Sequence, residues 1–238
     1  MSSAARKFDV IVIGAGAAGM MCALTAGGRG RRVLLLDHAE KVGKKILISG
    51  GGRCNFTNLY CEPGNFLSEN PHFCKSALAR YTQYDFMEMV DRHGIAWHEK
   101  TLGQLFCDES ARQIVAMLTA ECDAAGVETR TGCEVRAVGR SDHFRVETGQ
   151  GSFTADSLVL ATGGLSIPKM GATGFAHQIA RQFDLPLTDI RPGLVPLTFA
   201  GETRDLMTGL SGVALNCVAT AGTAAFQEAM LFTHRGLS

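Results

Sequence analysis

The chain has 238 residues, of which 46% are hydrophobic and 19% are charged. This composition belongs to a folded globular protein, and the length allows one large domain or one and a half. The 23 Lys and Arg residues balance the 23 Asp and Glu residues. A neutral chain has no global field that attracts a polyanion, so we expect a small-molecule substrate and neither a nucleic-acid nor a membrane partner.

The eight cysteines show no CxxC motif and no paired metal-ligand spacing. This pattern predicts free thiols in a reducing cytoplasm, without a metal site. Two uncharged stretches, 10–28 and 206–227, are interrupted by Gly and Thr. We therefore predict that neither of them spans a membrane.

The N-terminal segment has the order of a dinucleotide-binding unit. Residues 8–13 (FDVIVI) predict a buried parallel strand, and the turn 14–19 (GAGAAG) follows directly. A helix of small residues is predicted to reach about Ala26 and to stop at two glycines, before a second strand over 33–36 that Asp37 closes. Strand, glycine turn, helix, strand and acid in this order are far more specific than an isolated GxGxxG match.

Each part of this unit has a predicted role toward a dinucleotide. The first glycine makes the turn, the second admits the pyrophosphate, and the third lets the helix meet the sheet. The helix N-terminus supplies amides to the phosphates, and the terminal acid accepts the ribose hydroxyls. The predicted cofactor-binding residues of this unit are Gly14, Gly16, Ala17, Ala18, Gly19, Asp37 and His38.

Further along the chain, two helices have N-terminal capping signals. Thr82 with Asp85 predicts a helix that runs to His93, and Ser110 with Gln113 predicts a helix that ends at Gly126. Short strands are predicted over 127–130, 133–138, 144–148 and 158–162, and a helix is predicted after Gly174.

From residue 192 the sequence alternates in the manner of antiparallel strands, most clearly over 212–218. We therefore expect a first domain over 1–190 and the beginning of a second domain over 191–238.

The stretch KVGKKILISGGGRCNFTN, residues 41–58, carries three consecutive glycines beside several cations. Glycines are costly to order, so such a run predicts a positive φ or a ligand that leaves no room for a Cβ atom. A plain NAD dehydrogenase would continue with further βαβ units here. The glycine-lysine loop therefore favours FAD, whose greater length needs a second loop.

Five segments carry a family resemblance: GAGAAG, KVGKKILISGGGRCNFTN, LVLATGGLSIPKMGATG, LVPLTF and LFTHRGLS. Together they resemble the BaiN-like (YhiN-like) bacterial NAD(P)/FAD-dependent oxidoreductases, over the whole chain. The resemblance implies an α/β fold, with a glutathione-reductase-type FAD-binding Rossmann domain interrupted by a separate, mainly β insertion domain. Chains of this family continue beyond HRGLS to a last glycine-rich FAD motif, so we expect this chain to be a truncated form.

The resemblance also implies further FAD contacts. In the second loop, the residues that surround the pyrophosphate, ribityl chain and flavin would be Lys45, Ser49, Gly50, Gly51, Gly52, Arg53, Cys54 and Asn55. The backbone of Val135 would pair with adenine. A second glycine turn, made by Ala161, Thr162, Gly163 and Gly164, would close over the dinucleotide.

No catalytic residue stands out. Cys54 is a weak candidate because it lies in the flavin loop, but a redox dithiol needs a nearby partner and Cys61 is seven residues away. A structural role beside FAD is therefore the better interpretation of Cys54.

Two function classes, and a third possibility, follow from these patterns. The first is an FAD-dependent oxidoreductase that transfers a hydride through flavin N5 between NAD(P)H or a small organic substrate and an acceptor. No second GxGxxG is present, so NAD(P)H would bind without a dedicated motif. The alternative is a flavin-dependent nucleic-acid modification protein or adaptor, against which the neutral charge counts. An inactive truncated fragment is the third.

Overall fold

The computed structural model describes residues 6–167, 171–193 and 195–238. The chain divides into two compact units, Met1–Pro186 and Leu187–Ser238, here called unit 1 and unit 2. The division falls close to the domain boundary that the sequence predicts between residues 190 and 191. The roles predicted for the two domains stay predictions.

Unit 1 is built on a six-stranded sheet with the order β6-β2-β1-β9-β8-β7. Four of its strands are parallel, and β8 and β7 are antiparallel additions at one edge. The strand bounds are Arg6–Ile13 (β1), Val33–Leu36 (β2), Glu128–Arg130 (β6), Val135–Arg140 (β7), Phe144–Thr148 (β8) and Gly151–Leu160 (β9).

Strand β9 is longer than the sequence predicts. It begins at Gly151 rather than at residue 158, and it ends at Leu160 rather than at residue 162. The early half pairs with β8, and from Phe153 onward the strand also pairs in parallel with β1. The first half of β9 contains polar residues, so the sequence did not predict a strand there. It is a strand because it pairs with β8, since strand propensity depends strongly on context.

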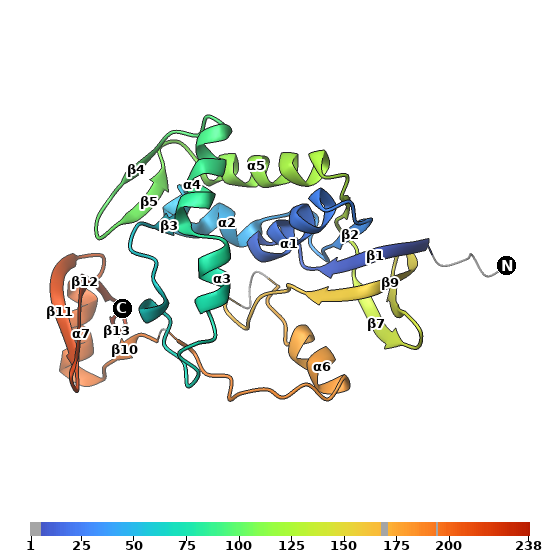
Figure 1. The fold of residues 1–238 in the computed structure, drawn as a ribbon. Coiled ribbons are helices and arrows are strands. Elements are labelled where there is room, and N and C mark those ends of the chain that lie inside the picture. The colour runs from blue at the N-terminus through green and yellow to red at the C-terminus, as the bar shows by residue number, and fades with distance from the viewer. Residues whose placement is uncertain (1–5, 168–170, 194) are drawn as a thin grey trace. The chain divides into compact units, whose positions relative to one another are not determined.

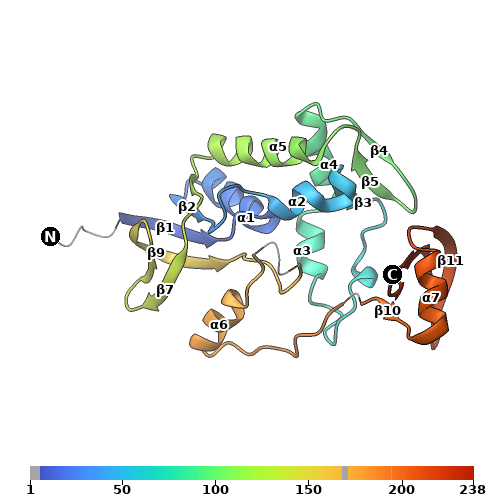
Figure 2. The ribbon, with the colours of Figure 1, turned by 180° about the vertical axis from the view of Figure 1, so that it is seen from behind.

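Helices cover both faces of this sheet. Figure 1 and Figure 2 show α1 (Ala17–Gly28) and α5 (Ala111–Ala124) on one side of β1 and β9, and α6 (Phe175–Gln182) on the other. Along β1 the side chains alternate, so that Val12 joins the core under α1 and α5 while Ile11 and Ile13 join the core under α6. A strand buried on both faces reads as the continuous apolar run seen in the sequence.

Helix α1 continues through the two glycines that were predicted to stop it. A Cβ atom at Gly27 would lie 2.5 Å from the carbonyl oxygen of Ala125, so this glycine lets α1 and the end of α5 approach closely. The helix ends at Gly28, and Gly30 adopts a φ of +75° in the following turn. The left-handed position that ends a helix therefore belongs to Gly30.

The capping signals of the other two helices are confirmed. Helix α4 (Gln83–Arg92) begins after Thr82, whose N–H donates to the Asp85 carboxylate at 2.6 Å. Helix α5 begins after Ser110, whose side chain accepts the N–H of Arg112 at 3.2 Å. Both N-termini satisfy free amide groups with local side chains, which is why the sequence alone locates them.

Several small elements between β2 and α5 have no clear sequence signal. They are α2 (Lys44–Ile48), a 3₁₀ turn over Ser49–Gly52, β3 (Asn55–Asn58), a 3₁₀ turn over Pro63–Asn65, α3 (Lys75–Arg80), β4 (Trp97–Glu99) and β5 (Gln104–Cys107). The three strands form an antiparallel sheet with the order β3-β5-β4. Elements this short show no helical or strand periodicity.

Unit 2 contains mainly strands and one helix. Its sheet has the order β10-β13-β12-β11, from β10 (Leu197–Thr198), β11 (Ala214–Ala221), β12 (Ala224–Thr233) and β13 (Gly236–Leu237). Helix α7 spans Gly201–Gly209. All pairings are antiparallel, as the alternation from residue 192 predicts, but that alternation did not predict helix α7. Among the described residues of both units, no helix combines the length and the apolar character needed to cross a membrane.

Candidate functional site

The candidate site lies where three neighbouring parallel strands of unit 1 end. Gly14 follows β1, Asp37 follows β2 and Ala161 follows β9. The ladder continues just past the strand ends, because Gly14 N–H donates to Leu36 O at 2.7 Å and Ala161 N–H donates to Ile13 O at 2.8 Å. The carboxyl ends of parallel strands are where open α/β sheets bind ligands.

The three glycines of the first turn differ in what requires them. Gly14 has a φ of +108°, and a Cβ atom there would collide with the backbone of Ala161. A Cβ atom at Gly19 would collide with the carbonyl of Gly14. Gly16 has an ordinary φ of −83°, and none of the described residues has an atom within 4 Å of its Cβ position. The fold therefore needs glycine at two positions, while the third leaves an open approach that fits a pyrophosphate.

Helix α1 presents its N-terminus to this open space. Gly16 is the N-cap, and no side chain accepts the first amide groups. The free N–H groups and the positive end of the helix dipole therefore face the region beside Ala17 and Ala18. This is the usual arrangement for binding a phosphate.

Asp37 holds the turn as well as facing the site. Its Oδ2 accepts the N–H of Ala15 at 2.7 Å, and its Oδ1 accepts the N–H of Ala39 at 2.8 Å. The side chain is 14% exposed, and an ionised carboxylate has about four acceptor positions in all, so capacity remains for ribose hydroxyls. The sequence predicts only the ligand role and misses the support of the turn.

Two adjoining cavities of about 300 and 510 Å³ follow this edge of the sheet. The smaller one is lined by Leu36, Val135 and Phe175 among others. The larger one is lined by the first turn, by Lys41, Lys44 and Lys45, and by residues 161–163. Both cavities share Gly14, Asp37, His38, Thr162 and Gly171, so they form one groove, which we call the dinucleotide groove.

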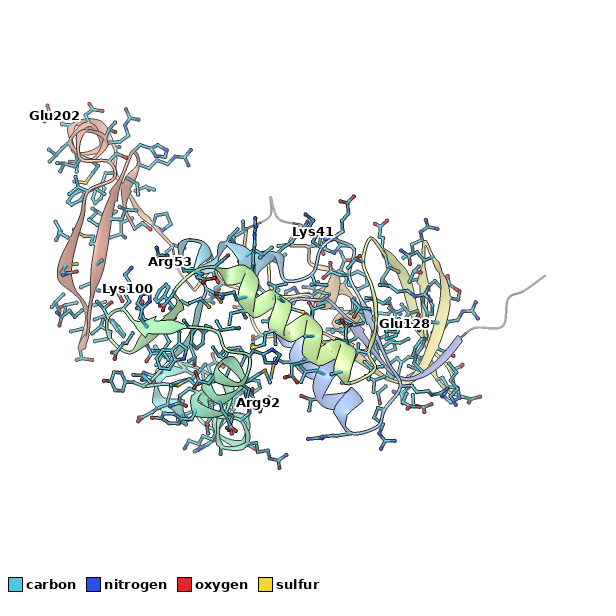
Figure 3. The ribbon with its side chains drawn as sticks, turned by 90° about the horizontal axis from the view of Figure 1, so that it is seen from above. Lys41, Arg53, Arg92, Lys100, Glu128 and Glu202 are labelled. Carbon is cyan, nitrogen blue, oxygen red and sulfur yellow. The ribbon has the colours of Figure 1, made fainter. Side chains whose placement is uncertain are left out.

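Lys45 connects the second loop with the second glycine turn. Its Nζ donates to Ser166 Oγ at 2.7 Å and lies 3.8 Å from the Cβ position of Gly163. No role is assigned to Lys41 or Lys44 from the sequence, yet both line the groove. Figure 3 shows Lys41 and Arg53 along one edge of unit 1, and Arg92 along the opposite edge.

The groove does not include every residue that the sequence predicts for it. Within the described residues, the lining omits Gly19, Ser49, Gly50, Gly51, Gly52, Arg53, Cys54, Asn55 and Gly164. Gly19 is packed against the first turn, whereas the others belong to the second loop and to the end of the second glycine turn. Their contacts with FAD stay predictions.

The glycines of the second loop form a turn of their own. Gly50, Gly51 and Gly52 have φ values of +56°, +66° and +87°. A Cβ atom at Gly50 would lie 2.6 Å from the ring of Phe106. The backbone conformation alone therefore favours glycine at all three positions.

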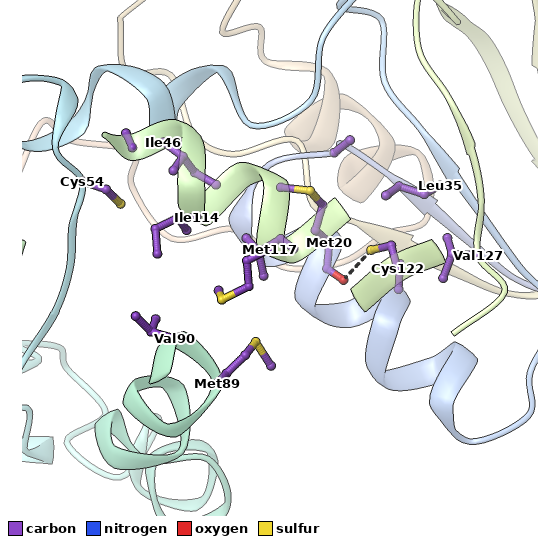
Figure 4. Close-up of a cluster of buried hydrophobic side chains, with 14 of the residues drawn as sticks. Met20, Leu35, Ile46, Cys54, Met89, Val90, Ile114, Met117, Cys122 and Val127 are labelled. Carbon is purple, nitrogen blue, oxygen red and sulfur yellow. Dashed lines mark hydrogen bonds between the residues drawn. The ribbon is translucent and has the colours of Figure 1, made fainter. Parts of the chain in front are cut away.

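Cys54 follows this turn and is buried. Figure 4 shows it in the same apolar cluster as Ile46 and Ile114. Burial raises the pKa of the Cys54 thiol, although a hydrogen bond with Ser49 acts in the opposite direction. A protonated thiol at neutral pH is a poor nucleophile, which favours a structural role.

A second buried cysteine lies near Cys54, which sequence spacing could not reveal. Asn55 pairs with Phe106 in the β3–β5 ladder, and Cys107 N–H donates to Arg53 O at 2.9 Å. Burial raises the pKa of the Cys107 thiol to about 11, and charge repulsion from the neighbouring Cys54 adds to the increase. Both thiols are free in this structure.

This sheet and its groove define the class of the protein: the fold is the α/β, Rossmann-type, FAD-binding fold of flavin-dependent oxidoreductases, as the sequence predicts. The open conformation of a flavocytochrome c3 fumarate reductase shares this fold. Its TM-score is 0.53 at 18% identity, over 89% of this chain and 47% of that one.

The chain belongs to the HI0933-like protein Rossmann domain family, whose model matches residues 8–232. A ribosomal RNA dihydrouridine synthase of Escherichia coli (strain K12) is 56% identical over 235 residues, which are 98% of this chain and 58% of the relative. A 3-dehydro-bile acid delta(4,6)-reductase of Clostridium scindens is 30% identical over 78% of this chain and 46% of the relative. The chain thus spans about half the length of these two curated relatives.

These comparisons correct the expectation about nucleic-acid partners, and they support the predicted family at a broader level. The expectation of no nucleic-acid partner is wrong, because a 56% identical relative is named for its action on ribosomal RNA. The error came from using net charge, which averages over the surface and hides a stretch such as 41–53, with four cations and no acid. The family is supported at the level of the HI0933-like proteins, and the expected truncation stays a prediction.

Proposed function

We propose that the protein binds FAD in the dinucleotide groove and uses it to reduce uridine to dihydrouridine in ribosomal RNA. The observation that carries this proposal is the 56% identity with the Escherichia coli synthase over 235 residues. A match over almost the whole chain includes the sheet edge, both glycine turns and the lysines described above. Because ribosomal RNA is the proposed substrate, we place the protein in the cytoplasm.

The proposed reaction adds two hydrogens across the C5–C6 double bond of the uracil ring. Bound FAD supplies the hydride chemistry, while the protein supplies binding, orientation and electrostatics. We propose NADH or NADPH as the donor, so that each cycle oxidises one nicotinamide, delivers a hydride and a proton to uridine, and returns the flavin to its starting state. The donor would bind without a Rossmann motif of its own.

The chain's own residues would divide the work of holding the cofactor. The amides at the N-terminus of α1 and the ammonium of Lys45 would bind the pyrophosphate. The remaining acceptor positions of Asp37 would bind the ribose hydroxyls, and the smaller cavity beside Val135 would take the adenine. Arg53 would approach the flavin from the second loop and stabilise negative charge on the reduced ring.

Reduction of a small unsaturated steroid is a second candidate. It is favoured by the Clostridium scindens relative, whose name also describes the reduction of carbon–carbon double bonds. We rank it second because the identity is 30% and the match covers 78% of this chain, against 56% and 98% for the synthase.

The test uses the full gene product with FAD, NADH or NADPH, and ribosomal RNA from cells that lack the gene. We expect the RNA to gain dihydrouridine, measured by mass spectrometry of its nucleosides, together with reoxidation of the reduced flavin. Protein without FAD, incubated with the same RNA, is the control. If the flavin is reoxidised by an unsaturated 3-oxosteroid but the RNA gains no dihydrouridine, the proposal fails in favour of the second candidate.

A further inference from the structure

The rim of the dinucleotide groove carries more positive charge than one FAD molecule needs. We propose that Lys41 and Lys44 contact the phosphodiester backbone of the RNA substrate, while Lys45 serves the dinucleotide. This inference rests on the proposed function and goes beyond it by locating part of the RNA-binding surface.

The three lysines share one cavity but differ in their contacts. All three are exposed and line the larger cavity. Lys45 is held toward the second glycine turn by its hydrogen bond with Ser166. Lys44 is the first residue of α2 and Lys41 lies in the turn before it, and within the described part of the chain no hydrogen bond or ion pair holds either ammonium group.

Counting charges leaves most of the charge of these two lysines without a partner in the cofactor. The FAD pyrophosphate carries about two negative charges, and the N-terminus of α1 already offers it free amides and about half a positive charge. Lys45 brings a full positive charge to the same groove. Lys41 and Lys44 would therefore leave the occupied groove with an excess of positive charge at its rim.

Some other cations of unit 1 form ion pairs within the chain. Arg32 pairs with Asp9, Arg92 with Glu121 and Arg130 with Glu128. Among the described ion pairs of the chain, none includes a cation of the 41–53 segment. Exposed cations without carboxylate partners can neutralise RNA phosphates, and the counterions that the RNA then releases contribute a large part of the affinity.

The position of these lysines also fits the substrate. The groove that would hold FAD is bordered by them, and Figure 3 places Lys41 on the same edge of unit 1 as Arg53. A uridine that reaches the flavin must bring its flanking phosphates close to the mouth of the same groove. The lysines at the rim can bind these phosphates in any sequence context, because phosphate contacts position the RNA without reading its bases.

The test compares Lys41→Gln/Lys44→Gln with Lys75→Gln, which changes an exposed lysine of α3 outside the groove. Two quantities are measured on the full gene product: FAD occupancy from absorbance, and affinity for ribosomal RNA from cells lacking the gene, across a series of salt concentrations. We expect the double variant to keep its FAD and to lose about tenfold or more in RNA affinity. The slope of log affinity against log salt should fall by about 1.5, as expected for two lost phosphate contacts.

Three outcomes would overturn the inference in different ways. Loss of FAD from the double variant would assign the lysines to the cofactor, whether or not RNA binding falls as well. An unchanged RNA affinity and salt slope would place the RNA elsewhere, and the proposed function would stand if the variant still formed dihydrouridine. If the unaltered protein neither binds RNA nor forms dihydrouridine, the proposed function itself fails.

Discussion

Two glycine-rich turns of unit 1, the first turn at 14–19 and the turn of the second loop at 50–52, have their glycines for different reasons. In the first turn, Gly14 and Gly19 are required by close approach of the protein's own backbone, whereas no described residue lies close enough to Gly16 to require glycine there. In the turn of the second loop, residues 50–52 all adopt positive φ values. A bound ligand is thus the natural explanation for Gly16 in the first turn. Backbone geometry is sufficient to explain the three glycines in the turn of the second loop.

The difference shows how a glycine run should be interpreted. Three consecutive glycines predict either a positive φ or a ligand. In the turn that begins at Ser49 all three have positive φ values, and a Cβ atom at Gly50 would also meet the ring of Phe106. Gly16 combines an ordinary φ and open space at its Cβ position with a place at the uncapped N-terminus of α1, and this combination is the stronger indication of a bound group. Four variants can test this comparison, from the largest expected effect to the smallest.

Gly14→Ala should have the largest effect, and it should act on folding. Alanine strongly disfavours a φ of +108°, and its Cβ atom would meet the backbone of Ala161. We expect the free energy of unfolding to fall by about 3 kcal/mol, measured by chemical denaturation without FAD. A stability equal to that of the unaltered protein would mean that the β1 and β9 strand ends are not packed as described.

Gly16→Val should separate binding from folding. The new side chain would enter the open space at the N-terminus of α1, so FAD affinity should fall at least 100-fold, or about 2.7 kcal/mol. The free energy of unfolding should change by about 1 kcal/mol or less, because only the N-cap is altered. Gly28→Ala is the matched control, since Gly28 also has open space but lies at the far end of α1. Undiminished FAD binding by Gly16→Val would remove the pyrophosphate from this turn.

The first turn is also the part of the site that the sequence predicts best. Its strand, turn, helix and acid are local in sequence, and each follows from the period of the apolar residues or from glycine chemistry. Asp37 illustrates the limit, because its two hydrogen bonds to the backbone N–H groups of Ala15 and Ala39 could not be foreseen from its position at a strand end.

Contacts between distant segments account for what the sequence could not predict. Gly171 and Lys41 line the groove because a later loop and the second loop both reach the end of β2. Cys107 lies near Cys54 only because β5 pairs with β3. No periodicity or spacing encodes such long-range pairings.

Gly50→Ala and Gly51→Ala should destabilise the turn of the second loop to different extents. Both substitutions force alanine into the left-handed region, at a cost of about 1 to 2 kcal/mol. Gly50→Ala should cost more, because its Cβ atom would also lie 2.6 Å from Asn55 N and from the Phe106 ring, whereas nothing lies within 4 Å at Gly51. In thermal unfolding without FAD, Gly50→Ala should therefore have a lower melting temperature than Gly51→Ala. If Gly51→Ala nevertheless loses FAD while it remains folded, a ligand does lie against this turn.

The smallest expected effect concerns the reactivity of Cys54, which follows the turn of the second loop. Because burial raises the pKa of this thiol, less thiolate is present at pH 8 than in an exposed cysteine, and alkylation by iodoacetamide should be slow. The rate should increase as the pH rises above 9.0, and denaturant should remove the protection at any pH. The sign of the stability change follows from the same shift: the unfolded thiol ionises first, so the free energy of unfolding should fall as the pH rises above 9.0. Peptide mapping after timed labelling measures the reaction at Cys54 itself. Rapid labelling of the folded protein at pH 7 would instead mean an activated thiol beside the flavin loop, and would restore Cys54 as a catalytic candidate.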